Sequence, residues 1–168
     1  MISLNIVSLP KYLDEVKLSL SNQLIDLIAF NETRLDLTKT NDQIKINCYD
    51  VIRKDRSRTG GGVCIYLRST INYRERSDLV PLDLESVCVE IIKPHSQPFI
   101  ITTVYRPPNS STEFFTIFEN LIRAVDDENK DLHILGDLNG DLLKVIPDHP
   151  TKKLKLLYEL YQLSQFIN

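Results

Sequence analysis

The chain has 168 residues, of which 42% are hydrophobic and 26% charged, and its formal net charge is −3. These fractions are those of an ordinary globular domain, and they exclude a wholly disordered or fibrous chain. A negative net charge gives no overall attraction for nucleic acid, so a phosphate-bearing partner would have to be bound by a local group of residues.

The first half of the chain predicts four strands, a helix and a hairpin turn. Residues 2–7 form a short apolar strand, and apolar residues at helical spacing predict a helix directly after it. Residues 25–30 are an almost unbroken apolar run, which is typical of a strand buried on both faces. Residues 44–48 alternate apolar and polar side chains, which predicts a half-buried strand. The glycines of residues 55–62 predict a hairpin turn into a strand over 63–67.

The second half continues this alternating pattern. Residues 86–92 and 98–106 predict two further strands. Residues 113–125 carry an apolar stripe at helical spacing, so we expect an amphipathic helix there. A buried strand over 132–135 and a last helix over 151–165 complete the pattern. Strands that neighbour one another in sequence, with helices between them, predict a layered α/β domain with mixed sheets.

Cysteine usage and hydropathy indicate an intracellular protein. The cysteines, Cys48, Cys64 and Cys88, are widely spaced and form no Cys-x-x-Cys pair, so we expect reduced core residues. No stretch reaches the ~18 apolar residues that a membrane span needs. The N-terminal residues show neither the basic leader nor the long apolar run of a signal peptide.

Polar residues stand at the ends of predicted strands, where side chains point into crevices at a sheet edge. They are Asn5, Glu32, Tyr105, Arg106, Asp137 and Asn139. Taken singly, each has a structural alternative, such as a solvated strand exit for Glu32 or a turn at Asp137. Taken together, the carboxylates and amides form a set of hard oxygen ligands, which Mg²⁺ or Mn²⁺ prefers and zinc does not.

Five segments in this order resemble the endonuclease/exonuclease/phosphatase superfamily. They are Leu-Asn-Ile-Val-Ser-Leu at 4–9, Asp-Leu-Ile-Ala-Phe-Asn-Glu-Thr at 26–33, Gly-Gly-Gly-Val-Cys-Ile-Tyr at 60–66, Val-Tyr-Arg-Pro-Pro-Asn at 104–109 and Ile-Leu-Gly-Asp-Leu-Asn at 134–139. The glycine turn, the Tyr-Arg-Pro-Pro exit and the Thr-Lys-Lys-Leu helix most resemble the apurinic-type endonuclease domain of non-LTR (LINE-like) retrotransposons. The resemblance implies a four-layer α/β sandwich over residues 1–168, with two mixed β-sheets flanked by helices and without its C-terminal strands.

The resemblance also implies the roles of the site residues. Glu32 would be the principal ligand of Mg²⁺ (or Mn²⁺), with Asn5 beside it on the metal side. Asp137 would activate or position the attacking water. Tyr105 and Asn139 would contact the scissile phosphate. The substrate-binding set that follows is Tyr105, Arg106 and Asn139, and the catalytic set is Glu32, Tyr105, Asp137 and Asn139.

The family pattern continues with a second aspartate and a Ser-Asp-His motif that this sequence does not contain. His95, His133 and His149 lie outside the matching positions. We therefore expect a Mg²⁺-dependent DNA-nicking endonuclease of a retrotransposon-derived protein, impaired in the chain as given, and leave open whether the chain is an enzyme. The alternatives are an inactive remnant or binding module, and a phosphatase of the same superfamily. A nuclear location would follow from action on DNA, and an exposed sheet edge would favour self-association.

Basic residues cluster around the predicted hairpin. They are Arg53, Lys54, Arg56 and Arg58. One interpretation is a solvated turn, and the other is a contact with DNA phosphates, in which each neutralised phosphate steepens the dependence of binding on salt.

Overall fold

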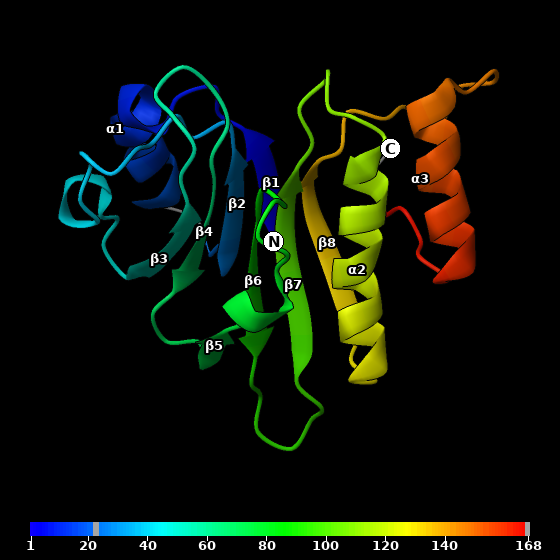
Figure 1. The fold of residues 1–168 in the computed structure, drawn as a ribbon. Helices are drawn as coiled ribbons and strands as arrows, with labels where there is room; N and C mark the ends of the chain where they lie inside the picture. The colour runs from blue at the N-terminus through cyan, green and yellow to red at the C-terminus, as the bar shows by residue number, and fades with distance from the viewer. Residues whose placement is uncertain (22–23, 167–168) are drawn as a thin grey trace.

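Two β-sheets form the centre of the fold. The computed structural model describes residues 1–21 and 24–166, which form two four-stranded sheets packed against each other (Figure 1). The strands of the first sheet are β1 (Ile2–Asn5), β2 (Leu27–Asn31), β3 (Tyr49–Lys54) and β4 (Val63–Arg68). Those of the second are β5 (Tyr73–Glu75), β6 (Ser86–Ile91), β7 (Phe99–Tyr105) and β8 (Leu132–Asp137). The strand orders are β1-β2-β4-β3 and β5-β6-β7-β8. Both sheets are mixed, because β1 runs parallel to β2 and β7 parallel to β8, whereas the other pairs are antiparallel.

Helices cover the outer faces of the two sheets. The helix α1 (Leu9–Ser21) packs on the first sheet, and α2 (Glu113–Asp127) and α3 (His149–Leu160) lie on the side of the second (Figure 1). Short 3₁₀ turns, η1 (Asp42–Ile44) and η2 (Ser77–Leu79), connect strands. The order of layers is helix, sheet, sheet, helix, which confirms the predicted four-layer α/β sandwich with two mixed sheets.

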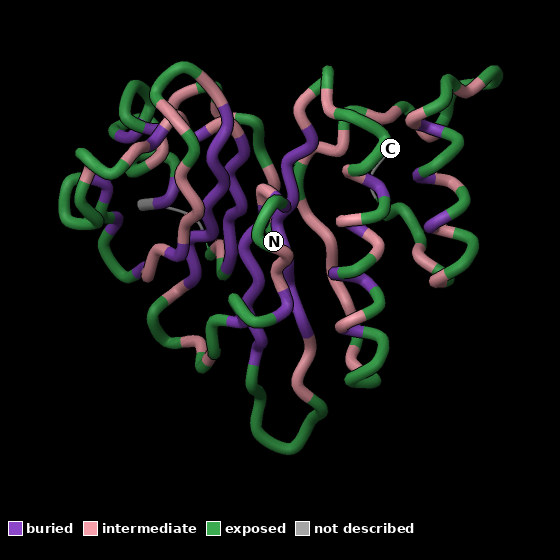
Figure 2. The backbone as a smooth tube through the Cα atoms, in the orientation of Figure 1, coloured by how far each residue is buried: buried purple, intermediate pink, exposed green. Residues whose placement is uncertain are grey.

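The strand β2 shows why the sandwich has several cores. Leu27 and Ala29 point into the core between the sheets, whereas Ile28 and Phe30 pack under α1. Successive side chains of a strand point to opposite faces, so a strand covered on both sides must be apolar throughout. Figure 2 shows buried backbone concentrated in the strands and on one side of the helices.

Residues 44–48 do not form the predicted strand. They comprise the end of η1 and a loop, and β3 begins at Tyr49. The alternation has another cause, because Ile44 and Ile46 are buried in the core under α1 while Lys45 between them is exposed. Cys48 is also exposed, contrary to the expectation of a core residue, while the other cysteines are buried.

The final helix is shorter than predicted and differs at both ends. The helix α3 begins at His149 and ends at Leu160. Its N-terminus is fixed by Asp148, whose Oδ1 accepts a hydrogen bond from the Thr151 backbone N–H at 3.0 Å. Of the described residues, no helix is long and apolar enough to cross a membrane.

Strand β8 was predicted to be buried, and in the structure it is a half-buried edge strand. A groove of about 910 Å³ runs beside it, lined by residues of β8, α3 and the segment that follows α3. Several large apolar side chains near the C-terminal part of the chain are exposed, including Val145, Ile146 and Phe166. Among the described residues no strand pairs with the outer edge of β8.

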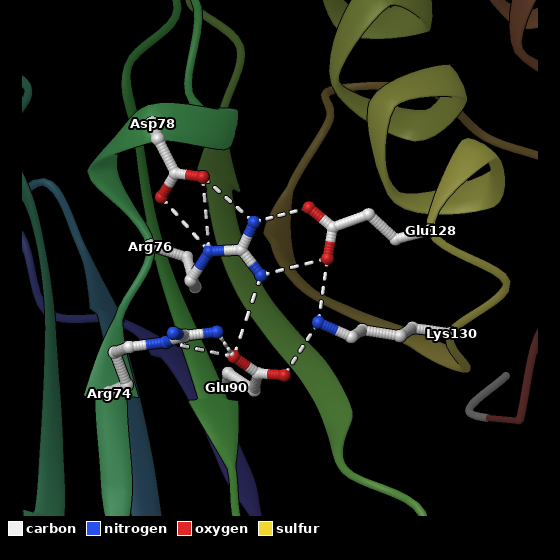
Figure 3. A network of polar contacts seen from close by, with 6 residues as sticks. All are labelled: Arg74, Arg76, Asp78, Glu90, Glu128 and Lys130. Atoms are coloured by element: carbon white, nitrogen blue, oxygen red, sulfur yellow. Dashed lines mark hydrogen bonds and ion pairs between the residues drawn. The ribbon is translucent and has the colours of Figure 1, made fainter.

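An ion network joins the second sheet to the end of α2 (Figure 3). Its members are Arg74, Arg76, Asp78, Glu90, Glu128 and Lys130. Arg76 is central, with Nη1 3.0 Å from Glu128 Oε2 and Nε 2.9 Å from Asp78 Oδ1. Lys130 closes the network, with Nζ 2.6 Å from a carboxylate oxygen of Glu90. The three basic and three acidic groups balance each other in charge, which lets the nearly buried Arg76 and Glu90 remain ionised.

Candidate active site

Four predicted site residues meet at one end of the sandwich. Asn5 ends β1, Glu32 follows β2, Tyr105 ends β7 and Asp137 ends β8. Asn5 Nδ2 lies 3.1 Å from Glu32 Oε1 and 3.5 Å from Asp137 Oδ2. The Tyr105 hydroxyl donates to the same Glu32 oxygen at 2.9 Å. Because one nitrogen reaches both carboxylates, they lie well within the ~12 Å that a metal ion and a bound phosphate could bridge.

The backbone around Glu32 is held in an unusual conformation. Glu32 has φ 54° and Arg34 has φ 53°, both in the left-handed region that non-glycine residues seldom adopt. Backbone hydrogen bonds to the glycine hairpin hold this segment, from Thr33 N to Gly62 O at 3.1 Å and from Arg34 N to Gly61 O at 2.9 Å. Such conformations cluster at functional sites, where the surrounding structure maintains them.

The surroundings of Glu32 favour its ionised form. The hydrogen bond from Asn5 is the main cause that lowers the pKa of Glu32 below its ordinary value, and burial opposes it. The hydrogen bond from Tyr105 and the charges of Arg34 and Arg56 lower this pKa further. Tyr105 behaves in the opposite way, because burial and its bond to Glu32 raise the pKa of its phenol to about 12. At neutral pH the pair is therefore a carboxylate and a neutral hydroxyl donor.

A tight turn after β8 presents Asp137. Gly136 has φ 120°, and a Cβ atom there would lie 2.0 Å from the Val104 carbonyl oxygen, so only glycine allows β8 to approach β7 this closely. The Asn139 backbone N–H donates to Asp137 Oδ1 at 2.9 Å. The Asn139 side chain donates to the Arg106 carbonyl oxygen at 2.6 Å. One oxygen of Asp137 is thus used by the turn, and the other faces Asn5.

Arg106 lies behind this turn. It is 3% exposed, and its Nη1 donates to the carbonyl oxygens of Leu138 at 3.4 Å and Asn139 at 3.2 Å. Its guanidinium also lies over the rings of Phe114 and Phe115, at 5.8 and 5.2 Å from their centroids. The structure therefore places Arg106 as a support of the Asp137–Asn139 turn.

The donor set fits a hard divalent cation. Of the described residues, no group of three or more His, Cys, Asp or Glu side chains could hold a metal ion. Mg²⁺ commonly binds to one or two carboxylates and completes its shell with water and substrate phosphate, so Glu32 and Asp137 suffice in type. Asn5 Oδ1 accepts from the Val7 backbone N–H at 3.2 Å, so the amide turns its nitrogen toward the carboxylates.

The sequence marks Arg56 only as one member of the basic cluster and gives no direct indication of its partner Glu85. Arg56 lies over the Tyr105 ring, 5.8 Å from its centroid, and pairs with Glu85. The sequence feature that accompanies the pair of Arg56 and Glu85 is the glycine run at 60–62, because side chains there would occupy the space of the pair. His133 packs edge-on against Phe99, at the end of β7 and β8 remote from Asp137.

Solved structures with the same fold include nucleases and a 3′ phosphatase. No known protein family and no curated protein matches the sequence. The endonuclease domain of TRAS1, a telomere-specific non-LTR retrotransposon, matches with TM-score 0.69 and 13% identity over 95% of this chain and 69% of that one. The 3′-5′ exonuclease NExo from Neisseria meningitidis matches with TM-score 0.68 and 18% identity over 95% and 70% of the two chains. An AP endonuclease from Archaeoglobus fulgidus matches with TM-score 0.61 and 17% identity over the same shares. The chain therefore shares its fold with these nucleases, which is the architecture that the resemblance in its sequence implied.

Proposed function

We propose that this chain carries the site of a Mg²⁺- or Mn²⁺-dependent phosphodiester hydrolase that nicks DNA. The observation that carries the proposal is the meeting of Glu32, Asp137 and the Tyr105 hydroxyl at one end of the sandwich. The support from fold is that proteins with this architecture include the TRAS1 endonuclease domain and the 3′ phosphatase NExo bound to a product DNA hairpin. Action on DNA would place the protein in the nucleus.

Each residue has a role in this proposal. Glu32 holds the metal ion, which when bound would offset charge on the phosphate oxygens. Asp137 orients the attacking water and accepts its proton. On substrate binding, Tyr105 would turn its single hydroxyl proton from Glu32 to the phosphate. Asn139, on the exposed turn, would donate the amide N–H that does not bind the Arg106 carbonyl oxygen. Asn5 holds the two carboxylates in place, and the buried Arg106 acts on the substrate only through the turn that it supports.

We propose further that the 168 residues hydrolyse DNA slowly on their own. Among the described residues no histidine lies at the site, because His95 is in the β6–β7 loop, His133 is near the start of β8 and His149 begins α3. No imidazole therefore supports charge developing on the phosphate. Removing one donor of this kind typically lowers the rate by about 10²–10³-fold.

The first test measures metal binding, which does not depend on turnover. Electron paramagnetic resonance of free Mn²⁺ should show one bound ion for the unaltered chain. Glu32→Gln should lose it, and Glu159→Gln, on the exposed side of α3, should keep it. Equal binding by the unaltered chain and Glu32→Gln would contradict the metal site.

The second test is plasmid nicking with protein in excess over DNA and the TRAS1 endonuclease domain as reference. The 168-residue chain should nick at least about 10²-fold more slowly than the reference. This residual activity should require Mg²⁺ and disappear in Asp137→Asn. Nicking as fast as the reference would show that a histidine is unnecessary. An inactive remnant or binding module predicts no metal-dependent nicking at all.

A phosphatase is the second candidate, because NExo, described as a 3′ phosphatase, has the same fold. An oligonucleotide with a 3′-terminal phosphate separates the two. Release of inorganic phosphate without nicking of intact plasmid would favour the phosphatase.

A further inference from the structure

The structure separates Arg56 from the other basic residues of the hairpin. Arg53 donates to a backbone carbonyl, as does Lys54, whose Nζ lies 2.7 Å from its acceptor. Arg58 pairs with Asp36, with 2.6 Å between Nε and Oδ2. These three side chains stabilise the hairpin and its neighbours. Arg56 is the member of the cluster that reaches the candidate active site.

The Arg56 guanidinium is placed on Tyr105 with one donor nitrogen to spare. Its Cζ lies 5.8 Å from the centroid of the Tyr105 ring. Nη1 lies 3.0 Å from Glu85 Oε2, and Nε donates to the Gly60 carbonyl oxygen at 2.9 Å. Nη2 has no hydrogen-bond partner among the described residues, and 43% of the side chain is exposed.

The hairpin backbone leaves space for this arrangement. A Cβ atom at Gly61 would lie 2.2 Å from Arg56 Cζ and 2.5 Å from Glu85 Oε1. The Gly62 backbone N–H donates to the Glu85 carboxylate. The Glu85 backbone carbonyl oxygen accepts from the Tyr105 backbone N–H at 3.0 Å. The glycine run therefore positions a guanidinium beside the tyrosine.

We propose that Arg56 is a substrate-binding residue that contacts a DNA phosphate bound next to Tyr105 and Glu32. The inference rests on the proposed function and adds a residue outside the predicted site. Two carboxylates close together repel a phosphate, so a fixed cation beside them would favour phosphate binding. A guanidinium suits this role, because its charge is permanent and its N–H groups form charge-assisted hydrogen bonds with phosphate oxygens. The Tyr105 ring and Glu85 hold it in advance, which reduces the entropy lost on binding.

The test is equilibrium binding of a short fluorescent DNA duplex, followed by anisotropy in EDTA over a range of NaCl concentrations. Each phosphate contact contributes about 0.9 to the slope of log K against log salt concentration. Arg56→Ala and Arg56→Gln should both bind more weakly and reduce this slope by about 1. Arg56→Lys should retain it, because lysine keeps the charge.

Arg58→Ala is the matched control, because Arg58 lies in the same hairpin but pairs with Asp36. It should leave the slope unchanged. Equal slopes for the unaltered chain and Arg56→Gln, or no measurable DNA binding by the unaltered chain, would overturn the inference. A reduction of the slope in Arg58→Ala as large as that in Arg56→Ala would also overturn the inference. Because the assay contains neither metal nor turnover, its result is distinguishable from failure of Mn²⁺ binding or nicking.

Discussion

Asn5 and Asp137 end strands of different sheets, and the Asn5 Nδ2 amide nitrogen lies 3.5 Å from the Asp137 Oδ2 carboxylate oxygen. The same nitrogen lies 3.1 Å from Glu32 Oε1. One amide thus links two carboxylates that would otherwise repel each other, and it does so across the two sheets.

Replacing Asn5 by alanine should weaken metal binding. The substitution removes the donor between the two carboxylates, and loss of a supporting group beside a metal typically lowers affinity by about 10–100-fold. Titration calorimetry with Mn²⁺ measures the change. Asn47→Ala, at an exposed loop position of the same half of the chain, is the control. An affinity in Asn5→Ala equal to that of the control would remove Asn5 from the site.

Replacing Tyr105 by phenylalanine should slow nicking by about 10²-fold, because the hydroxyl donor is lost. The melting temperature should change little, since the ring and its contact with Arg56 are kept and Glu32, which loses the hydrogen bond, is partly exposed to water. Tyr66→Phe gives the opposite pattern. That hydroxyl donates to the buried Ile44 carbonyl at 2.7 Å, so its loss should cost about 1 kcal/mol of stability without slowing nicking. An unchanged nicking rate in Tyr105→Phe would contradict the proposed contact between the Tyr105 hydroxyl and the phosphate.

Replacing Arg76 by alanine should destabilise the fold by about 3 kcal/mol, because its acidic partners lose a nearly buried cation. Arg74→Ala tests the same network at its surface, where the side chain is 62% exposed, and should cost less than about 1 kcal/mol. Urea unfolding measures both. Equal losses of unfolding free energy in the two variants would show that the burial of Arg76 does not add to its contribution to stability.

Acid should weaken the same network in a defined pH range. The hydrogen bond from Arg76, followed by that from Lys130, holds the pKa of Glu128 at about 2, below its ordinary value of 4.5. Because this pKa is lowered in the folded state, ionised Glu128 contributes its full stabilisation above about pH 4.5 and loses it as the pH falls to about 2. Urea midpoints at intervals across this range should therefore fall less in Glu128→Gln than in the unaltered chain, with Glu159→Gln as control. Parallel curves would contradict the prediction.

The unpaired edge of β8 should cause self-association. An unpaired strand edge beside a groove of about 910 Å³ offers backbone hydrogen bonds and apolar surface to a second chain. Sedimentation velocity should show a mass that rises with concentration. His133→Lys, which places a charge on the edge strand, should reduce the effect. A monomer at every concentration would contradict this proposal.

The sequence by itself determined most of the strands and the layered architecture, because each depends on a local pattern. The apolar run that became β2 and the stripe of α2 are read from neighbouring residues, and burial in the sandwich agrees with both. The alternation at 44–48 predicted a strand wrongly. A loop that buries every second side chain in a core shows the same period of two residues as a strand.

The candidate site itself was decided only by tertiary structure. The motifs marked Glu32 and Asp137, but parallel pairing within two sheets and the packing between them bring the two carboxylates to one amide. The sequence could not distinguish the two arginines near Tyr105, since Arg106 turns inward to support a loop while Arg56, distant in sequence, lies on the ring. Side-chain direction at a strand end depends on the chain that packs against it, and that contact is not encoded by local periodicity.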